Sequence, residues 1–150
     1  MLPDTLIQLF KRDLNKLKIE IDAYKTESSL WFLDKDINNT AGNLCLHVIG
    51  NLNHFIGAII GNSGYVRRRD LEFSLNNIPK KDMLIQIDDT VQMIEKVLKH
   101  LSTKTLEEVY PVEVFGKPMT TEYFLVHLTT HLAYHLGQIN YHRRLLDSLE

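Results

Sequence analysis

Apolar side chains recur at helical spacing along most of the chain. In the N-terminal segment they step by three or four residues, which places them on one stripe of a helix over residues 4–26. This stripe consists of Leu6, Phe10, Leu14, Leu17, Ile21 and Tyr24. The same spacing predicts a helix over residues 82–102, with Asp82 placed to cap it and Pro79 just outside it. That second stripe consists of Leu84, Ile87, Val91, Ile94, Leu98 and Leu101.

Two further helices complete the pattern. Asn39 and Thr40 open a segment over residues 40–61, whose apolar stripe consists of Leu44, Val48, Leu52, Phe55 and Ile59. Thr120 or Thr121 opens the longest segment, over residues 121–148. Four amphipathic helices in 150 residues predict an all-α fold, a four-helix bundle that forms a single domain over residues 1–150.

The segments between the predicted helices differ in length. The second and third helices are joined by about twenty residues, which is long enough for a crossover, so these two helices could run parallel. Before the last helix, β-branched and aromatic residues surround Gly116 and Lys117, a pattern compatible with a small two-stranded ribbon.

The second helix is apolar enough to require a comparison with membrane spans. No charged residue occurs between Asp36 and Arg67, and the apolar stretch is about long enough to cross a bilayer. However, His47, Asn51 and His54 share one face near its middle, where polar groups are costly in lipid. We therefore expect a buried helix with a polar inner stripe and no membrane association. Three glycines would let a neighbouring backbone approach closely: Gly50, Gly57 and Gly61.

Composition and charge narrow the function classes. Hydrophobic residues make up 44% of the chain, which is typical of a globular protein. Lys and Arg number 17 against 19 Asp and Glu, so the clustered basic excess that nucleic-acid binding requires is missing. A single cysteine, Cys45, excludes an internal disulfide and a Cys-rich zinc module. The N-terminal segment is charged and amphipathic and unlike a secretory signal, so we expect a cytoplasmic protein.

Histidines concentrate in the last predicted helix. At ~100° per residue, one narrow face carries His127, His131, His135, Gln138 and His142. Histidines four residues apart bring two imidazoles to one point, which is a common way to hold a divalent metal. A third ligand must come from another helix, and His47 on the inner stripe of the second helix is the natural candidate. Three neutral imidazoles leave coordination positions open, as in catalytic sites.

Hydrogen-bonded core histidines are the main alternative to a metal site in this helix. Each buried imidazole would then need partners for both nitrogens, however, and few carboxylates lie in the last helix. The motifs of three other classes of metal protein are missing from the sequence. It has no His-Glu-x-x-His of a zinc protease, no helical Glu-x-x-His of a di-iron bundle and no Cys-x-x-Cys-His for haem attachment. Cys45 points about 200° away from His47 on the helix and is expected to be an inert buried thiol.

Three segments carry a resemblance to a known family. NLCLHVIGNLNHFIGAIIG, GYVRRRDLEF and HLTTHLAYHLGQINYHRR resemble the DinB/YfiT-like superfamily of four-helix metalloproteins, and the similarity extends over nearly the whole chain. The resemblance implies that His47, His131 and His135 hold a divalent metal such as nickel or zinc, with water completing the coordination. His127 is not a general ligand of the family; it could support a ligand, act as a fourth ligand or line the pocket. Asn51 and His54 are candidates for pocket residues beside His47, and His54 could instead lie at the surface.

The resemblance also suggests an activity. It implies a homodimer and a metal-dependent transferase that acts on a small molecule with a low-molecular-weight thiol such as bacillithiol, mycothiol or glutathione. A bound metal can hold a thiol as its thiolate, or activate water as in a hydrolase. A non-catalytic bundle, with a structural metal and a role in dimerisation or partner binding, is the alternative. We interpret Arg67, Arg68 and Arg69 mainly as loop salt bridges or solvated charge, although one could reach an anionic substrate.

Overall fold

The computed structural model describes residues 1–147, and all regular secondary structure within them is helical. The predicted all-α class is therefore confirmed; residue 148, the predicted end of the last helix, lies outside the described residues. The α-helices are α1 (Leu2–Asp22), α2 (Ala41–Leu52), α3 (Arg69–Ser74), α4 (Lys80–Leu98), α5 (Thr103–Glu107) and α6 (Thr121–Leu146). A 3₁₀ helix, η1 (Glu27–Trp31), follows α1, and a π-helix, η2 (Asn53–Ile60), continues α2.

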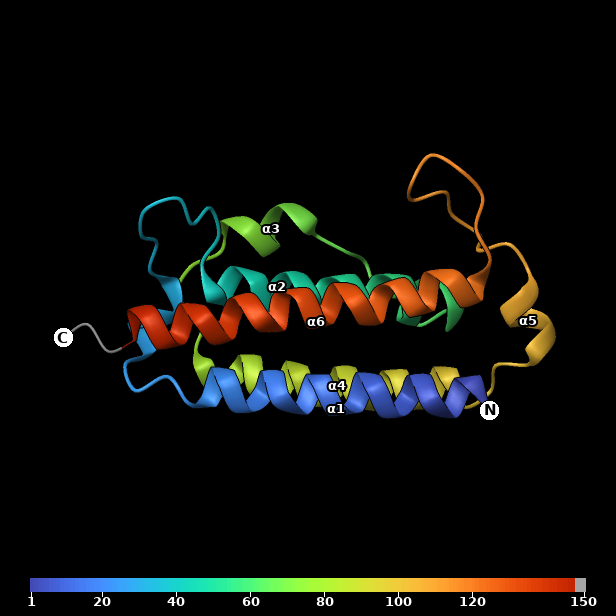
Figure 1. Cartoon of the computed structure of the whole chain (residues 1–150), viewed down its shortest axis with the longest axis horizontal. Helices are drawn as coiled ribbons and strands as arrows, with labels where there is room; N and C mark the ends of the chain where they lie inside the picture. The colour runs from blue at the N-terminus through green and yellow to red at the C-terminus, as the bar shows by residue number, and fades with distance from the viewer. Residues whose placement is uncertain (148–150) are drawn as a thin grey trace.

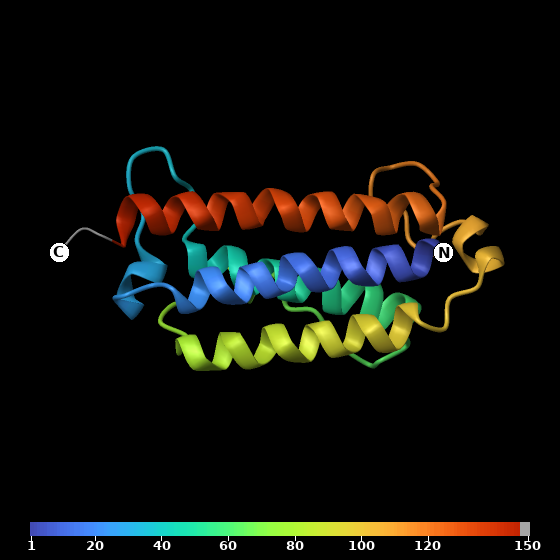
Figure 2. The same ribbon diagram turned by 60° about the horizontal axis from the view of Figure 1, so that its bottom comes forward.

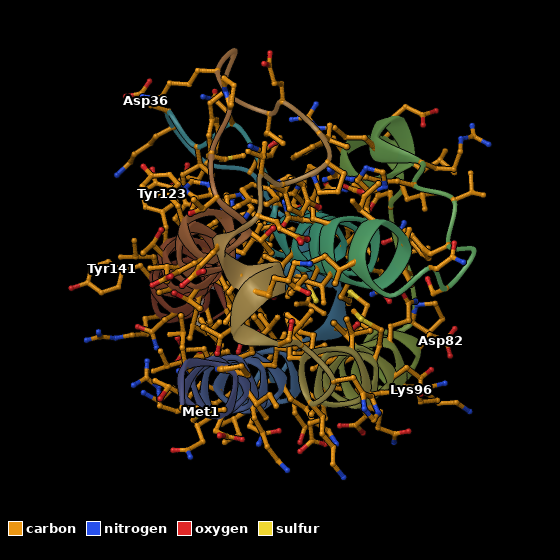
Figure 3. The ribbon with its side chains drawn as sticks, turned by 90° about the vertical axis from the view of Figure 1, so that its right-hand side faces the viewer. Met1, Asp36, Asp82, Lys96, Tyr123 and Tyr141 are labelled. Carbon is orange, nitrogen blue, oxygen red and sulfur yellow. The ribbon has the colours of Figure 1, made fainter. Side chains whose placement is uncertain are left out.

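The four long helical segments lie side by side (Figures 1 and 2). α1 packs against α4 and α6, and α2 packs against the same two helices. α2 and α4 run in one direction, whereas α1 and α6 run in the other (Figure 2). An end-on view shows side chains filling the space between these helices, while Asp82 and Lys96 of α4 and Tyr141 of α6 point outward (Figure 3).

Burial of the apolar stripes explains why these segments pack together. Every residue of the α1 stripe is at most 2% exposed. The α4 stripe contributes Ile87, Ile94 and Leu98 to the fully buried core, and its other members pack against that core. Removing such side chains from water is the main favourable contribution to folding.

Threonines set the starts of α2 and α6. The hydroxyl oxygen of Thr40 accepts a hydrogen bond from the backbone N–H of Asn43 at 3.0 Å, and that of Thr120 accepts one from Tyr123 at 3.1 Å. Both caps agree with the prediction. The predicted Asp82 cap is wrong: α4 begins earlier, at Lys80, directly after Pro79, and Asp82 lies within its first turn. Pro79 has a φ of −54°, close to the helical value that its ring imposes, so it can lead directly into a helix.

Two predicted features end differently in the structure. The first helix stops at Asp22 rather than near residue 26, and the chain turns into η1. The predicted ribbon is reduced to one isolated bridge between Val109 and Thr120, where the Tyr110 N–H donates to the Met119 carbonyl at 2.9 Å. The intervening residues bend through Gly116, which has a φ of 74°, and no ladder follows the single bridge within residues 1–147.

The α2–η2 segment also resembles a membrane span in length and composition. Ala41–Ile60 has a mean hydropathy of 1.3, but 67% of its most apolar 18-residue stretch is buried inside the protein. A core helix of a globular protein passes the same test, so this one match is weak evidence for a membrane span.

Candidate metal centre

Three histidines meet where α2 and α6 pack in opposite directions. His47 comes from α2, and His131 and His135 come from successive turns of α6. The Nε2 atom of His131 lies 3.2 Å from His47 Nε2 and 3.1 Å from His135 Nε2. The structure thus brings together the three side chains predicted as ligands, close enough to hold one metal ion.

The spacing of these nitrogens suits a shared cation. Two imidazole nitrogens at about 2.1 Å from one metal stand about 3.0–3.4 Å apart at octahedral or tetrahedral angles. The two observed Nε2 separations, 3.1 and 3.2 Å, fall in this range. Hydrogen bonding alone satisfies the cluster poorly, because His131 Nε2 faces two nitrogens and a neutral imidazole carries one N–H. The three residues therefore fit a divalent cation.

Burial keeps the α6 histidines neutral. It lowers the pKa of His131 to about 3, with further lowering from the neighbouring His135 and His47. Burial also lowers the pKa of His135, and this effect exceeds the opposing one of its hydrogen bond to Gln138. Metal ligation requires unprotonated imidazole, so both residues are prepared to bind a cation at neutral pH.

A buried ion pair orients His47. The Nδ1–H of His47 donates to Glu72 Oε1 at 3.0 Å, and Arg67 donates to both oxygens of the same carboxylate at 2.9 Å. Glu72 is 6% exposed. Its burial would raise its carboxyl pKa, but the hydrogen bonds from His47 and Arg67 and the charge of Arg67 outweigh this and lower it. Because the carboxylate accepts a hydrogen bond from Nδ1–H, the proton stays on Nδ1 and Nε2 of His47 is free to bind a metal. Such carboxylate–histidine pairs commonly support metal sites.

Gly50 provides the space for this carboxylate. A Cβ atom at this position would collide with the Glu72 side chain, so only glycine lets Glu72 lie across α2 beside His47. The prediction that a neighbouring backbone approaches here is wrong, because the close neighbour is a side chain. Glu72 was missed as a site residue, since nothing in the spacing of the linker distinguishes it from Asp70.

The remaining linker charges behave largely as expected. Arg68 pairs with Asp70 at 3.2 Å, and both side chains are more than 60% exposed. The guanidinium of Arg69 lies 5.1 Å from the ring centre of Phe73. Arg67 differs, because its carboxylate partner directly contacts a candidate ligand.

Gln138 orients the second α6 histidine. Its side-chain oxygen accepts a hydrogen bond from His135 Nδ1 at 2.7 Å, which again leaves Nε2 for the centre. Gln138 also borders a cavity of about 360 Å³ whose other walls include the loop of residues 36–39, Leu44 and Tyr141. The cavity is also lined by His142 and Leu145, and it is connected to the candidate centre only through Gln138, which contacts His135.

Of the other predicted pocket residues, His127 lies beside a candidate ligand, with its ring centre 6.3 Å from that of His131. His127 is half-buried, its ring stacked at 6.0 Å from that of Phe124 and edge-on to Phe115 at 4.7 Å. Burial lowers its pKa. His54 is half-buried and packs against Phe55; burial, followed by repulsion from Arg67, lowers its pKa.

Asn51 lies one helical turn beyond His47. It is 6% exposed, and among residues 1–147 no group hydrogen-bonds its side-chain oxygen. An unsatisfied buried oxygen of this kind is uncommon in folded proteins.

Two residues near these stripes have other roles. His142 shares the predicted face of α6 but contacts Tyr24 and Phe32 instead: its Nδ1 lies 2.7 Å from the Tyr24 hydroxyl and its Nε2 2.9 Å from the Phe32 carbonyl. Seven residues from His135, it stands about 10 Å farther along the helix axis. Cys45 is fully buried, as expected, and burial raises its pKa to about 12.

The fold and the site together define an all-α protein with a three-histidine candidate metal centre supported by a buried Glu–Arg pair. The model of one protein family, described as "Protein of unknown function (DUF1572)", matches residues 4–150. The chain therefore belongs to the DUF1572 family. A search of curated proteins finds no match to this chain.

Proposed function

We propose that this protein is an enzyme that depends on a divalent transition metal held by His47, His131 and His135. The observation that carries the proposal is the position of His131 Nε2, 3.2 Å from His47 Nε2 and 3.1 Å from His135 Nε2. His131 and His135 are only half-buried, which suits a site that a small molecule can reach. A structural metal would instead favour a closed set of four protein ligands.

We interpret the four long helical segments as a four-helix bundle of the DinB/YfiT-like type. The parallel course of α2 and α4 (Figure 2) supports a crossover formed by the linker that contains α3. In this interpretation the crossover contributes Glu72 and Arg67 to the site.

Within this class we favour a thiol-dependent transferase. A bound cation would act as a Lewis acid, lowering the pKa of a thiol at the site. The chain's own thiol does not serve, because Cys45 is fully buried and its pKa is raised to about 12. The proposal therefore assigns the thiol to a small co-substrate such as bacillithiol or glutathione.

Each residue around the centre has a definite task in this proposal. Glu72 and Gln138 accept hydrogen bonds from the Nδ1–H groups of His47 and His135, fixing both rings with Nε2 toward the centre. Arg67 holds the Glu72 carboxylate in place and keeps it ionised.

Other parts of the proposal rest on the resemblance and on composition. They are nickel or zinc as the metal, a homodimer, a cytoplasmic location, a small-molecule substrate, and no binding to nucleic acid or membranes. A metal-dependent hydrolase is the second candidate, since the same cation could activate water.

Metal analysis tests the proposal directly. Protein purified without a histidine tag should carry about one divalent ion per chain, which is the stoichiometry of one three-histidine site. His47→Ala, His131→Ala and His135→Ala should each lose that ion. His100→Ala is the control: His100 is exposed just beyond the end of α4, so this variant should retain the ion. A screen of the metal-loaded protein with bacillithiol and glutathione against electrophiles, beside a panel of hydrolase substrates, then separates the two activities. Absence of stoichiometric metal from the wild-type protein would refute the proposed function.

A further inference from the structure

A second polar position lies one turn from the metal centre. Asn51 follows His47 by four residues on α2, and His127 precedes His131 by four on α6. Because α2 and α6 run in opposite directions, both steps lead toward the same end of the molecule (Figure 1).

Contacts on both sides of this position fix its register. On one side, His47 and His131 meet with their Nε2 atoms 3.2 Å apart. On the other side, Phe55 of η2 and Phe124 of α6 pack edge-on with ring centres 5.0 Å apart. Asn51 is midway between His47 and Phe55 in sequence, and His127 lies between Phe124 and His131, so Asn51 and His127 occupy the same level.

At this position a buried hydrogen-bond acceptor has no partner within residues 1–147. The side-chain oxygen of Asn51 is buried without a partner among the described residues. Leaving a buried acceptor unpaired is costly and uncommon in folded proteins, so this oxygen calls for a partner. On α6 at this level, the rings of Phe115 and Phe124 surround the His127 ring with apolar groups.

We propose that Asn51 and His127 form a substrate subsite beside the metal centre, which binds a neutral N–H or O–H donor attached to an apolar group. The donor pairs with Asn51 Oδ1, and the apolar group packs on Phe115 and Phe124. Anions are disfavoured because Oδ1 is an acceptor, and full charges of either sign are disfavoured because they would lose hydration beside the Phe115 and Phe124 rings. The inference rests on the proposed metal-dependent function and adds the class of substrate to it.

A pair of probes tests the hydrogen bond in the zinc-loaded protein. Benzohydroxamate chelates metals through two oxygens and keeps an N–H, whereas N-methylbenzohydroxamate lacks that donor. Wild-type protein should bind the N–H probe about tenfold more tightly in calorimetric titrations, as one hydrogen bond provides. Asn51→Leu should abolish this preference, and His127→Phe should weaken both probes, each with full metal retained. A tenfold preference that persists in Asn51→Leu, or its absence from the wild type, overturns the proposal.

A second measurement needs no metal. If Asn51 Oδ1 is unpaired, the metal-free Asn51→Leu protein should unfold at a higher urea concentration than the wild type. Asn53 is the matched control: its amide donates to the Ile49 carbonyl and to Thr90, so Asn53→Leu should lower the midpoint. A lower midpoint for Asn51→Leu would reveal a structural partner and overturn the subsite. If the wild type does not take up metal, the proposed function is refuted instead. The urea comparison of Asn51→Leu with Asn53→Leu would still show whether the Asn51 side-chain oxygen has a structural partner.

Discussion

Replacing Glu72 by glutamine should weaken metal binding without removing any of the three proposed ligands. The variant keeps the shape of the side chain and an oxygen that can accept the His47 Nδ1–H. It removes the negative charge of the carboxylate, which in the wild type accepts hydrogen bonds from His47 at 3.0 Å and from Arg67 at 2.9 Å. His47 becomes a weaker electron donor and its ring is less firmly held.

The expected size of the effect follows from the position of the carboxylate. Changes to groups that hydrogen-bond a metal-ligating histidine typically reduce metal affinity about 10- to 100-fold, or about 1.4–2.7 kcal/mol. Glu72 is 6% exposed and its bond to His47 is protected from water, so a value within this range is expected. A solvent-exposed pair would contribute much less.

Competition with a chromophoric chelator measures this loss for zinc and for nickel. Asp70→Asn is the matched control, because Asp70 also lies on α3 but pairs with Arg68 in solvent. The metal affinity of this variant should equal that of the wild-type protein. Circular dichroism checks that the Glu72→Gln protein remains folded under the assay conditions. An affinity within twofold of the wild-type value would refute the role assigned to Glu72.

Three further predictions follow from the same structure. Gly50→Ala should reduce metal affinity as strongly as Glu72→Gln, because its Cβ would displace that carboxylate; chelator competition checks this, and an unchanged affinity would contradict the packing described. Gly137→Ala should raise the free energy of unfolding by about 0.5–1 kcal/mol in urea titrations, because alanine is the better helix former. An added Cβ would meet open space at this position of α6, and a loss of stability would contradict this reasoning. The metal-free protein should lose stability as the pH falls below about 6.5, the ordinary histidine pKa. The unfolded chain takes up protons there, whereas His131, with a pKa of about 3, and His135, with a lowered pKa, remain unprotonated in the folded state; a urea midpoint that stays constant from pH 7.5 to 5.5 would exclude this linkage.

Much of the candidate site could be predicted from local spacing. Histidines four residues apart necessarily share a helix face, so the proximity of His131 and His135 follows once α6 forms. His47 was selected by its place on the inner stripe of an uncharged helix, and the structure brings it to the same point. Helix starts at Thr40 and Thr120 were equally predictable, because capping depends on a few adjacent residues.

The residues that support the centre were not predictable in this way. Glu72 reaches His47 across 25 positions of sequence, through a linker whose path no local rule specifies. His142 has the same face angle as the site histidines, but its distance along the axis places it against Tyr24 and Phe32 instead. The π-helix after Asn51 likewise changes the register of the residues that follow, which a simple helical projection does not anticipate.

The sequence by itself therefore determined the all-α class, the apolar stripes and the proximity of His131 to His135, because each depends on the 3.6-residue period of one helix. It also indicated His47, through the polar inner stripe of a second helix. Only the tertiary structure decided which side chains complete the site. Three features depend on how separate helices pack: Glu72 lies over Gly50, Arg67 pairs with Glu72, and the Asn51 oxygen has no partner among the described residues. This packing is set by contacts between residues far apart in the chain.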